Sequence, residues 1–375
     1  MFKFLNLQPE IFGVDVNDLS LRIVKLKKKR KGFVVVSCSE VLVPPDVIKE
    51  GVVQNQDALV EIIKKALAGS KGKKLGTRYA IISLPEEKSF SQVIQMPRMT
   101  HQELVSAVPL EAENYIPLPI DKVYLDFQII DSHQGNDKNT LNHVDLLINV
   151  IPKTIADTYV ACFKKAGLIP CILEVESQAI ARALMKEGTS TSPIIFIDLG
   201  NANTSFIIFS GNSIRFTSSI PISSNQLTLA IAQKTKVSFD KAEELKLKFG
   251  LTTKKGEKNY DIVSAMDPLL SDLAQQIKKY IEFYRDHVSH EYFPLEGNIE
   301  KIVLCGGGAN LKELTDFLFK KLAIPVVIGD PCINLLPLKK GKNFLIPTAK
   351  AQSFATALGL ALRGASQGLL NEYHD

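Results

Sequence analysis

Two stretches of the chain share one alternation of apolar and polar residues. Residues 11–26 alternate Val, Leu and Ile on both sides of a short polar turn, and residues 194–209 repeat this pattern. In each stretch the first apolar run ends in an aspartate, Asp15 or Asp198, directly before the turn. The alternation predicts a β-hairpin in both places. Because the two hairpins lie a domain length apart, we interpret them as an internal duplication that gives two related domains facing each other.

The rest of the chain mixes short apolar runs with segments of helical periodicity. Strands are predicted at residues 32–37, 79–84, 123–130, 144–151 and 302–305, and helices at residues 57–68, 153–166, 225–234, 239–249, 269–290 and 351–363. Another helix is expected to begin near Leu311. Apolar residues at helical spacing indicate helices that pack one face against a core.

The region between the two hairpins has its own signals for helix ends and for a loop. Thr100 and Glu103 have the spacing of a capping box, so a helix is predicted to begin there. Pro109 is expected to kink that helix or to end it early. Residues 131–142 are polar and are predicted to form a loop. Gly167 is placed to end the next helix.

Length and composition indicate a soluble protein of more than one domain. The 375 residues exceed what one core usually holds, and 45% apolar with 23% charged residues is the balance of a globular chain. No stretch supplies the roughly 20 apolar residues of a membrane span, and the N-terminus lacks a signal-peptide pattern. The five cysteines form no C-x-x-C pair, which argues against a zinc site or a disulfide frame. We therefore expect a cytoplasmic protein with reduced thiols.

The net charge of +5 is concentrated in two basic runs, residues 25–31 and 71–78. Such runs can attach a protein to an anionic membrane surface or to nucleic acid. Solvated turns are the more ordinary interpretation of such runs. Aromatic residues do not alternate with the charges, so nucleic-acid binding is not expected. The membrane and the solvated-turn interpretations both stay open.

Three turns have the composition of a phosphate-binding loop. The first runs from Asp15 to Ser20, the second from Asp198 to Thr204, and the third is Gly306-Gly307-Gly308. Glycine lets backbone N–H groups approach an anion, and Asp198 can hold a hydrated Mg²⁺ ion. Glycine in a tight turn often serves the backbone alone, so each turn by itself is a weak indicator. Three such turns in a duplicated frame indicate a nucleotide site.

Further motifs join these turns in one family pattern. They are Met96-Pro97-Arg98-Met99, Glu111 to Pro119, Ala166-Gly167-Leu168, Ile220-Pro221, Ala242 to Lys246 and Glu282-Phe283-Tyr284. With them the chain resembles the PilM family of type IV pilus biogenesis proteins, a branch of the actin-like ATPase superfamily related to FtsA. The resemblance runs from about Phe12 to Leu362, and the Glu-Ala-Glu-Asn-Tyr-Ile-Pro motif at 111–117 is its most specific part.

The resemblance implies an α/β fold of the actin-like (ribonuclease H-like) kind. Two lobes would enclose a nucleotide cleft, with an inserted α+β subdomain in the first lobe. Residues 1–84, 166–193 and about 351–375 would form the first lobe, and residues 85–165 the inserted subdomain. Residues 194–350 would form the second lobe, with a helical subdomain at about 225–298.

The resemblance also implies ATP and Mg²⁺ as ligands. Asp15 and Asp198 would flank the magnesium through water molecules. Glu243 and Lys246, which lie on one helical face, would reach the ribose or the base, although such pairs are common on helix surfaces. The residues expected around the nucleotide are Asp15, Asn17, Asp18, Asp198, Gly200, Asn201, Asn203, Thr204, Glu243, Lys246, Gly306, Gly307 and Gly308.

The first turn departs from the family pattern, which has Asp-x-Gly followed by small hydroxyl residues. Here Asn17 replaces the glycine, and Asp18 and Leu19 follow it. Asparagine tolerates left-handed backbone, so Asn17 is expected to keep the shape of the turn. Asp18 would bring a negative charge toward the phosphates, and Leu19 removes a hydroxyl donor. We expect weak nucleotide binding and slow or absent hydrolysis.

As a family member the chain would be an adaptor that docks the N-terminal cytoplasmic peptide of a PilN-like inner-membrane protein, among other pilus assembly proteins. The groove is expected between the first lobe and the insert, at Met96, Leu104, Val108, Tyr115 and Ile116, which can equally be core residues. The protein would be cytoplasmic and peripheral to the inner membrane, in contact with it indirectly or through the basic runs. Whether it forms a homo-oligomer stays open.

Two other functions remain as alternatives. An FtsA-like filament protein of cell division attaches to the membrane through a C-terminal amphipathic helix, and the tail after Arg363 is expected to be too short and too acidic for that. A small-molecule kinase needs a carboxylate base near a substrate hydroxyl, and no candidate beyond Asp15 and Asp198 stands out.

Overall fold

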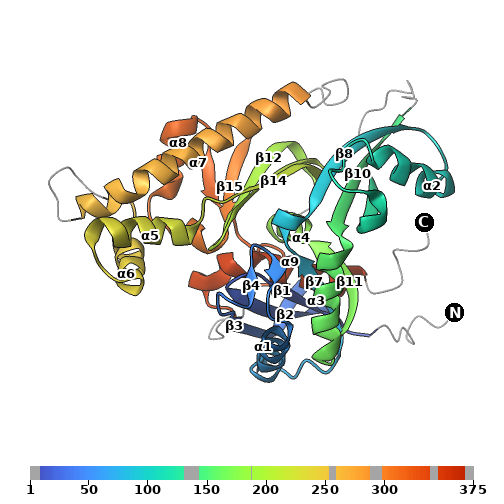
Figure 1. Ribbon diagram of the computed structural model, residues 1–375, viewed down its shortest axis with the longest axis horizontal. Helices are drawn as coiled ribbons and strands as arrows, with labels where there is room; N and C mark the ends of the chain where they lie inside the picture. The colour runs from blue at the N-terminus through green and yellow to red at the C-terminus, as the bar shows by residue number, and fades with distance from the viewer. Residues whose placement is uncertain are drawn as a thin grey trace.

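The computed structural model describes residues 9–130, 143–186, 188–252, 259–287, 298–337 and 345–367. The predicted loop at 131–142 lies outside the described residues, as does the end of the helix predicted at 269–290, beyond residue 287. Two β-sheets with helices on their faces form the two lobes (Figure 1). Within the described residues, no helix is both long and apolar enough to cross a bilayer.

The first sheet has the strand order β11-β7-β1-β2-β3-β6. Its strands are β1 (Phe12–Val16), β2 (Ser20–Lys29), β3 (Gly32–Leu42), β6 (Lys71–Gly72), β7 (Tyr79–Leu84) and β11 (Ile169–Val175). A small separate hairpin, β4 (Ile48–Lys49) and β5 (Val52–Val53), follows β3. Helices α1 (Gln56–Ala68) and α3 (Lys153–Lys165) cover one face and bury Leu59, Ile63 and Phe163 against it. The basic run at 25–31 is mostly strand, since β2 continues to Lys29, and only Arg30 and Lys31 form the turn.

The second sheet has the order β16-β15-β12-β13-β14-β8-β10-β9. Its strands are β8 (Phe90–Pro97), β9 (Val123–Ile130), β10 (His143–Pro152), β12 (Ser190–Leu199), β13 (Thr204–Gly211), β14 (Ser213–Ile220), β15 (Lys301–Cys305) and β16 (Val326–Ile328). Strands β14 and β8 meet at a single residue pair, Phe216 with Gln92. The strand pairing between the insert sheet, β8-β10-β9, and the second-lobe strands is therefore short, but Ile130 and Leu147 of the insert share a buried core with Phe209 and Ile214 of the second lobe.

The two sheets repeat one strand arrangement, which confirms the predicted duplication. In the first sheet β3, β2 and β1 are antiparallel neighbours, and β7 and β11 continue in parallel. In the second sheet β14, β13 and β12 are antiparallel neighbours, and β15 and β16 continue in parallel. Asp15 and Asp198 each lie at the end of the central strand, directly before its hairpin turn.

Two helices pack against each other between the sheets (Figure 1). Helix α4 (Glu176–Leu184) buries Ile180 against the second sheet, and α9 (Ala355–Gln367) buries Leu358 beside the first. Gly359 permits their contact, since a Cβ atom there would come within 1.8 Å of the Ala179 carbonyl oxygen. The starts of both helices, at Glu176 and Thr356, line one small cavity together with the turns after β1 and β12.

The remaining helices cover the outer face of the second sheet and the inserted sheet. They are α5 (Ser224–Thr235), α6 (Phe239–Phe249), α7 (Tyr260–His287) and α8 (Leu314–Leu322) on the second lobe, and α2 (His101–Ala112) on the insert. Short 3₁₀ helices are η2 (Glu86–Lys88), η3 (Ile120–Lys122), η5 (Gly307–Asn310) and η6 (Thr348–Phe354).

Most predicted elements are confirmed, and three boundaries are wrong. The capping box of α2 is present, but the helix continues through Pro109 to Ala112, so the early stop is wrong. Helix α7 begins at Tyr260 rather than 269 and passes Pro268. Residues 307–310 are a 3₁₀ helix, and α8 begins only at Leu314. Gly167 ends α3 with a positive φ of 87°, as predicted.

Candidate functional site

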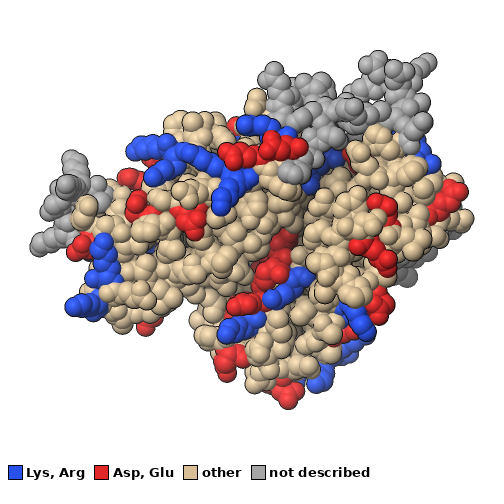
Figure 2. All heavy atoms as spheres, turned by 45° about the horizontal axis from the view of Figure 1, so that its top comes forward, with Lys and Arg blue, Asp and Glu red and all other residues tan. Residues whose placement is uncertain are grey.

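The three predicted turns meet in a cleft between the two sheets. Two adjoining cavities of about 60 Å³ each lie there, and both are lined by Asn17, Glu176, Asp198, Gly200 and Asn201. A wider groove of about 680 Å³ opens beside them, between η2 and β14. Figure 2 shows acidic and basic side chains close together in the hollow between the two halves of the molecule.

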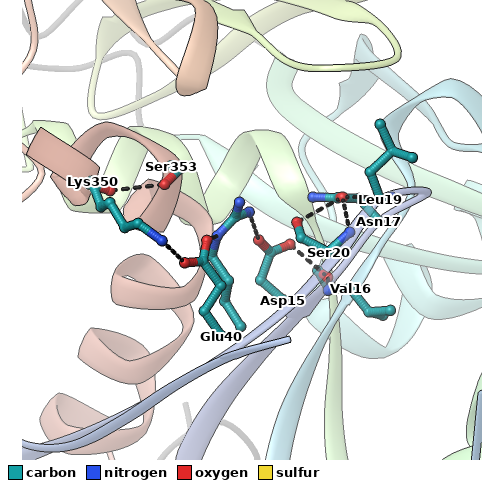
Figure 3. Close-up of polar contacts among 10 residues, drawn as sticks. Asp15, Val16, Asn17, Leu19, Ser20, Glu40, Lys350 and Ser353 are labelled. Carbon is teal, nitrogen blue, oxygen red and sulfur yellow. Dashed lines mark hydrogen bonds and ion pairs between the residues drawn. The ribbon is translucent and has the colours of Figure 1, made fainter. Parts of the chain in front are cut away.

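The first turn is closed by its own asparagine. The Asn17 side-chain oxygen Oδ1 accepts hydrogen bonds from the backbone N–H of Leu19 (3.3 Å), the backbone N–H of Ser20 (3.1 Å) and the Ser20 hydroxyl (3.0 Å), as Figure 3 shows. The backbone N–H of Asn17 itself donates to the Ser20 carbonyl at 3.0 Å. Asn17 does not have a positive φ, so the expectation of a left-handed residue there is wrong. The asparagine holds the turn through its side chain instead.

Asp18 points to a neighbouring loop. Its two carboxylate oxygens accept the backbone N–H groups of Glu50 (2.7 Å) and Gly51 (2.9 Å). Both residues have a positive φ, and the Tyr159 hydroxyl donates to the Gly51 carbonyl at 3.1 Å. Asp18 therefore fixes the β4–β5 turn at the rim of the cleft.

Asp15 is buried and paired with a cation that the sequence analysis overlooked. Its carboxylate lies 3.6 Å from the Arg22 guanidinium and accepts a 3.3 Å hydrogen bond from the Ser83 hydroxyl. Arg22 also donates to Glu40 at 3.1 Å, and Glu40 pairs with Lys350 of η6 at 2.5 Å (Figure 3). Burial raises the pKa of Asp15, and the charge of Arg22 opposes that rise. Arg22 is the third residue of β2, the strand that follows the turn. A basic residue so close to the turn was the signal that could have pointed to it.

The second turn leaves its polar groups open to the cleft. Within the described residues, the backbone N–H groups of Asn201, Ala202 and Asn203 make no hydrogen bond, and neither do the side chains of the two asparagines. Gly200 is required by packing, since a Cβ atom there would lie 2.8 Å from the Asn203 carbonyl oxygen. Thr204 is turned away and donates to the Ile222 carbonyl at 2.5 Å.

The glycine turn packs directly on the end of β12. Gly306 has a φ of +81°, and a Cβ atom there would lie 2.1 Å from a carboxylate oxygen of Asp198. A Cβ on Gly308 would lie 2.6 Å from the Leu199 side chain, whereas Gly307 is exposed and faces the cleft. Two of the three glycines thus serve the contact between this turn and the second hairpin.

Several carboxylates gather around the cleft. Burial and the charge of Asp15 raise the pKa of Asp198 to about 7, and burial together with the charge of Asp18 raises that of Glu87 to about 7. Burial and the charge of Asp15 also raise the pKa of Glu176, at the start of α4, well above its usual range. Glu176 and Glu87 were not predicted. Glu176 directly follows β11, and Glu87 lies three residues after β7, in η2. An acidic residue close behind a buried strand was the available signal.

The family model of the type IV pilus assembly protein PilM matches residues 13–365. The chain belongs to the PilM family. Its fold agrees with that of a solved structure named the PilM–PilN type IV pilus biogenesis complex, with a TM-score of 0.80 and 26% identity, over 96% of this chain and 99% of that chain. The predicted actin-like, two-lobed fold and the PilM resemblance are confirmed.

More distant relatives of this PilM-family chain include the cell division protein FtsA. FtsA of Buchnera aphidicola is 27% identical over 171 residues, 41% of this chain and 41% of the relative. FtsA of Borreliella burgdorferi is 24% identical over 306 residues, 73% of this chain and 70% of the relative. MreB5 of Spiroplasma citri, solved bound to AMPPNP, is 12% identical with a TM-score of 0.54 over 93% of this chain and 94% of that chain. That likeness shows the actin-like fold alone.

Glu243 and Lys246, expected at the ribose or base, do not line the cleft cavities, although Lys246 contacts Ser224, whose backbone N–H donates to the Gly200 carbonyl of the second turn at 2.9 Å. The Lys246 ammonium is buried and donates to the Ser224 hydroxyl (2.8 Å), the Thr228 hydroxyl (2.7 Å) and Glu243 (2.7 Å). Thr228 in turn donates to Glu243 at 2.5 Å. This cluster fastens α6 to α5 and leaves Lys246 no donor for a ligand.

The five predicted groove residues divide into core and surface. Met96, Leu104, Val108 and Ile116 are buried in the insert's own core, where α2 packs on β8 and β10. Their side chains are therefore closed to a partner in this conformation. Tyr115 is 43% exposed.

The residues of the first turn do not fit a Mg²⁺–nucleotide complex. The N–H groups of Leu19 and Ser20, which would hold a phosphate oxygen, already donate to Asn17. Among the residues that the structure describes, Arg22 is the one Lys or Arg that lines the two small cavities, and it is already paired with Asp15 and Glu40. Among the described residues, no three His, Cys, Asp or Glu side chains come together as a metal cluster. The second turn, by contrast, keeps groups that an anion could use.

Proposed function

We propose that this PilM-family chain is a scaffold of type IV pilus assembly that docks the N-terminal cytoplasmic peptide of a PilN-like inner-membrane protein. The observation that carries the proposal is the agreement, over 96% of the chain, with the fold of the PilM–PilN complex. In this proposal the actin-like fold serves to hold a protein partner. Nucleotide binding is weak and hydrolysis is slow or absent, because the first turn is occupied by its own side chain.

The peptide-binding surface involves the outside of the insert in this proposal. Tyr115 is joined there by other exposed apolar side chains of the same subdomain: Val105, Leu110, Leu118 and Tyr124. Exposed apolar side chains gathered on one subdomain are typical of a protein–protein contact. The buried residues Leu104 and Ile116 are unsuitable targets for substitution, since a charge there would unfold the insert.

The test is a fluorescence titration of the protein into a labelled N-terminal peptide of the PilN-like protein encoded beside it. We expect saturable binding that is weakened at least about tenfold by Leu110→Asp or Tyr115→Asp. Leu247→Asp is the matched control, because Leu247 is 53% exposed but lies on α6 of the other lobe. Absence of binding in the unchanged protein would contradict the docking function.

An FtsA-like filament protein is the second candidate, favoured by the matches to FtsA. Its test is light scattering and electron microscopy of the protein alone over a range of concentrations. Filaments formed by a protein that does not bind the peptide would move the assignment to this candidate. A small-molecule kinase has no observation in its favour.

We also propose that the protein is peripheral to the inner membrane, with the two basic runs as a second contact. They meet on the first lobe, where the pKa of Glu10 is lowered by a hydrogen bond and charge from Lys25 and by the charges of Lys27 and Lys73. Lys27 to Lys31 are exposed, and β6 carries the second run beside β3. Cosedimentation with phosphatidylglycerol vesicles, but not with phosphatidylcholine vesicles, is expected and should disappear at high salt.

A further inference from the structure

We infer that the cleft of this chain is occupied by its own side chains at the place of a nucleotide phosphate, and that an internal chain of ion pairs ties the lobes together without nucleotide. The inference deepens the proposed scaffold function and rests on it for its biological purpose. It concerns six side chains: Asn17, Asp18, Asp15, Arg22, Glu40 and Lys350.

The first step is the convergence of donors on Asn17 Oδ1. Two backbone N–H groups and one hydroxyl point to a single oxygen at 3.0–3.3 Å. Successive N–H groups that converge on one point form the usual binding site of a phosphate or carboxylate oxygen. The carboxamide oxygen of Asn17 thus takes the position that an anion would take. A phosphate could enter only by breaking these three hydrogen bonds.

The second step is the direction of Asp18. Its carboxylate is bound by the N–H groups of Glu50 and Gly51 at the rim of the cleft. These hydrogen bonds hold the Asp18 carboxylate in a fixed position, and Asp18 lines one of the two small cavities. A phosphate in that cavity would meet Asp18, Glu87 and Asp198 together. The charge of Asp18 repels an anion there, and Glu87 and Asp198 add to this repulsion as they ionise above about pH 7.

The third step is the ion-pair chain from Asp15 through Arg22 and Glu40 to Lys350. The contacts are 3.6, 3.1 and 2.5 Å. Lys350 lies on η6, and η6 contacts η5 at the glycine turn of the second lobe, where the Asn310 side chain donates to the Ala349 carbonyl at 3.5 Å. The chain of contacts therefore runs from the first sheet to the second. In an actin-like fold a ligand in the cleft contacts both lobes. Here the chain of contacts would connect the two lobes in place of that ligand.

The test is a gain of binding. In calorimetry with ATP and Mg²⁺, the unchanged protein is expected to bind with a Kd weaker than about 1 mM. Asn17→Gly empties the turn and frees both N–H groups, so this variant should bind at least about tenfold more tightly. Asn17→Gly combined with Asp18→Ser should bind more tightly still, because the nearby charge is removed as well.

Asn55→Gly is the matched control. Asn55 also accepts a backbone N–H, from Ala58 at 3.0 Å, but it caps α1 and does not line the cleft cavities. This variant should bind ATP no more tightly than the unchanged protein, and circular dichroism should show all variants folded. Micromolar binding of ATP by the unchanged protein would overturn the inference. So would folded Asn17→Gly variants that bind no better than the unchanged protein.

The peptide titration separates this inference from the proposed function. If the lobes are held together internally, the peptide affinity is the same with and without ATP and Mg²⁺. A peptide affinity that rises with ATP would overturn the inference and leave the docking function standing. A complete lack of peptide binding, with the gain of ATP binding in Asn17→Gly intact, would contradict the docking function alone.

Discussion

The turn after β1 and the turn after β12 occupy equivalent places in a duplicated fold but differ in how their polar groups are satisfied. In the first turn the Asn17 side chain accepts two backbone N–H groups and a hydroxyl. In the second, the N–H groups of Asn201, Ala202 and Asn203 have no hydrogen bond within the described part of the chain. Unsatisfied N–H groups at a cleft are suited to an anion, whereas satisfied ones are not.

The two turns are also anchored by different forces. The first is held by charge, through the buried pair of Asp15 and Arg22. The second is held by close packing, because the glycine turn presses on Asp198 and Leu199. Duplication thus kept the strand arrangement while the two halves of the cleft acquired different chemistry. The predictions below test each difference in turn.

The largest effect is expected from Gly306→Ala. The new Cβ atom would lie 2.1 Å from a carboxylate oxygen of Asp198, at a φ of +81°. The second turn must then move, and we expect a loss of about 4 kcal/mol in the free energy of unfolding by urea. Gly167→Ala is the control, since Gly167 has a φ of +87° but nothing within 4 Å of the new atom. It should cost only about 1 kcal/mol, and equal losses would contradict the packing argument.

Arg22→Met should remove the charge that anchors the first turn. The pair of Arg22 and Asp15 is almost wholly buried, with side chains 9% and 3% exposed. Loss of one partner leaves an uncompensated buried charge, and we expect about 3 kcal/mol less stability in urea unfolding at pH 8.

The double variant Asp15→Asn with Arg22→Met is the control for that prediction. It removes both charges, so more than half of the lost stability should return. If the double variant is as unstable as Arg22→Met alone, the loss comes from packing against Phe354, over which Arg22 lies at 5.6 Å, and not from charge.

The contrast between the turns was only partly accessible from the sequence. The alternation around Asp15 and Asp198 was enough to predict both hairpins, because a strand with one buried face has a period of two. The sequence could not show that the Asn17 side chain accepts hydrogen bonds from its own turn, because this depends on the side-chain rotamer. Asn17 was predicted to keep the shape of the turn through its backbone conformation. In the structure it does so through the hydrogen bonds that its carboxamide oxygen accepts.

The buried cluster around Lys246 illustrates a second limit. A pair spaced three apart on a helix predicts a common face, and the structure has it. Which way that face turns depends on the packing of α5 against α6, where Ser224 and Thr228 supply the acceptors. The five expected groove residues show the same ambiguity, because an apolar residue on a helix can face a core or a partner.

Asp198→Asn tests the electrostatics of the second turn. The pKa of Asp198 is raised from 3.8 to about 7, mainly by burial. The unfolded chain ionises this group from about pH 4, so stability is full below that pH and falls as the pH rises through about 7. The side chain keeps part of its surface open to the cleft, so the gain for the variant at pH 8 should be about 2 kcal/mol, less than the full shift would give.

The gain of the Asp198→Asn variant should almost vanish at pH 4, where the folded protein is uncharged at this position and the unfolded chain is only about half ionised. Asp240→Asn, on the exposed surface of α6, is the control and should leave the pH dependence of unfolding as it is. A gain that stays constant from pH 4 to pH 8 would show that Asp198 is not destabilised by its charge.

The smallest effect compares the two turns directly, by Asn17→Ala and Asn203→Ala. The first variant loses an oxygen that three donors share, and we expect it to be about 1.5 kcal/mol less stable in urea unfolding. The second loses a half-buried carboxamide that bonds no other described residue, so its stability should stay within about 0.5 kcal/mol of the unchanged protein. Because both substitutions remove the same atoms, the difference isolates what the side chain does in each turn. Equal losses would mean that the second turn is also closed internally, and the asymmetry of the cleft would have to be abandoned.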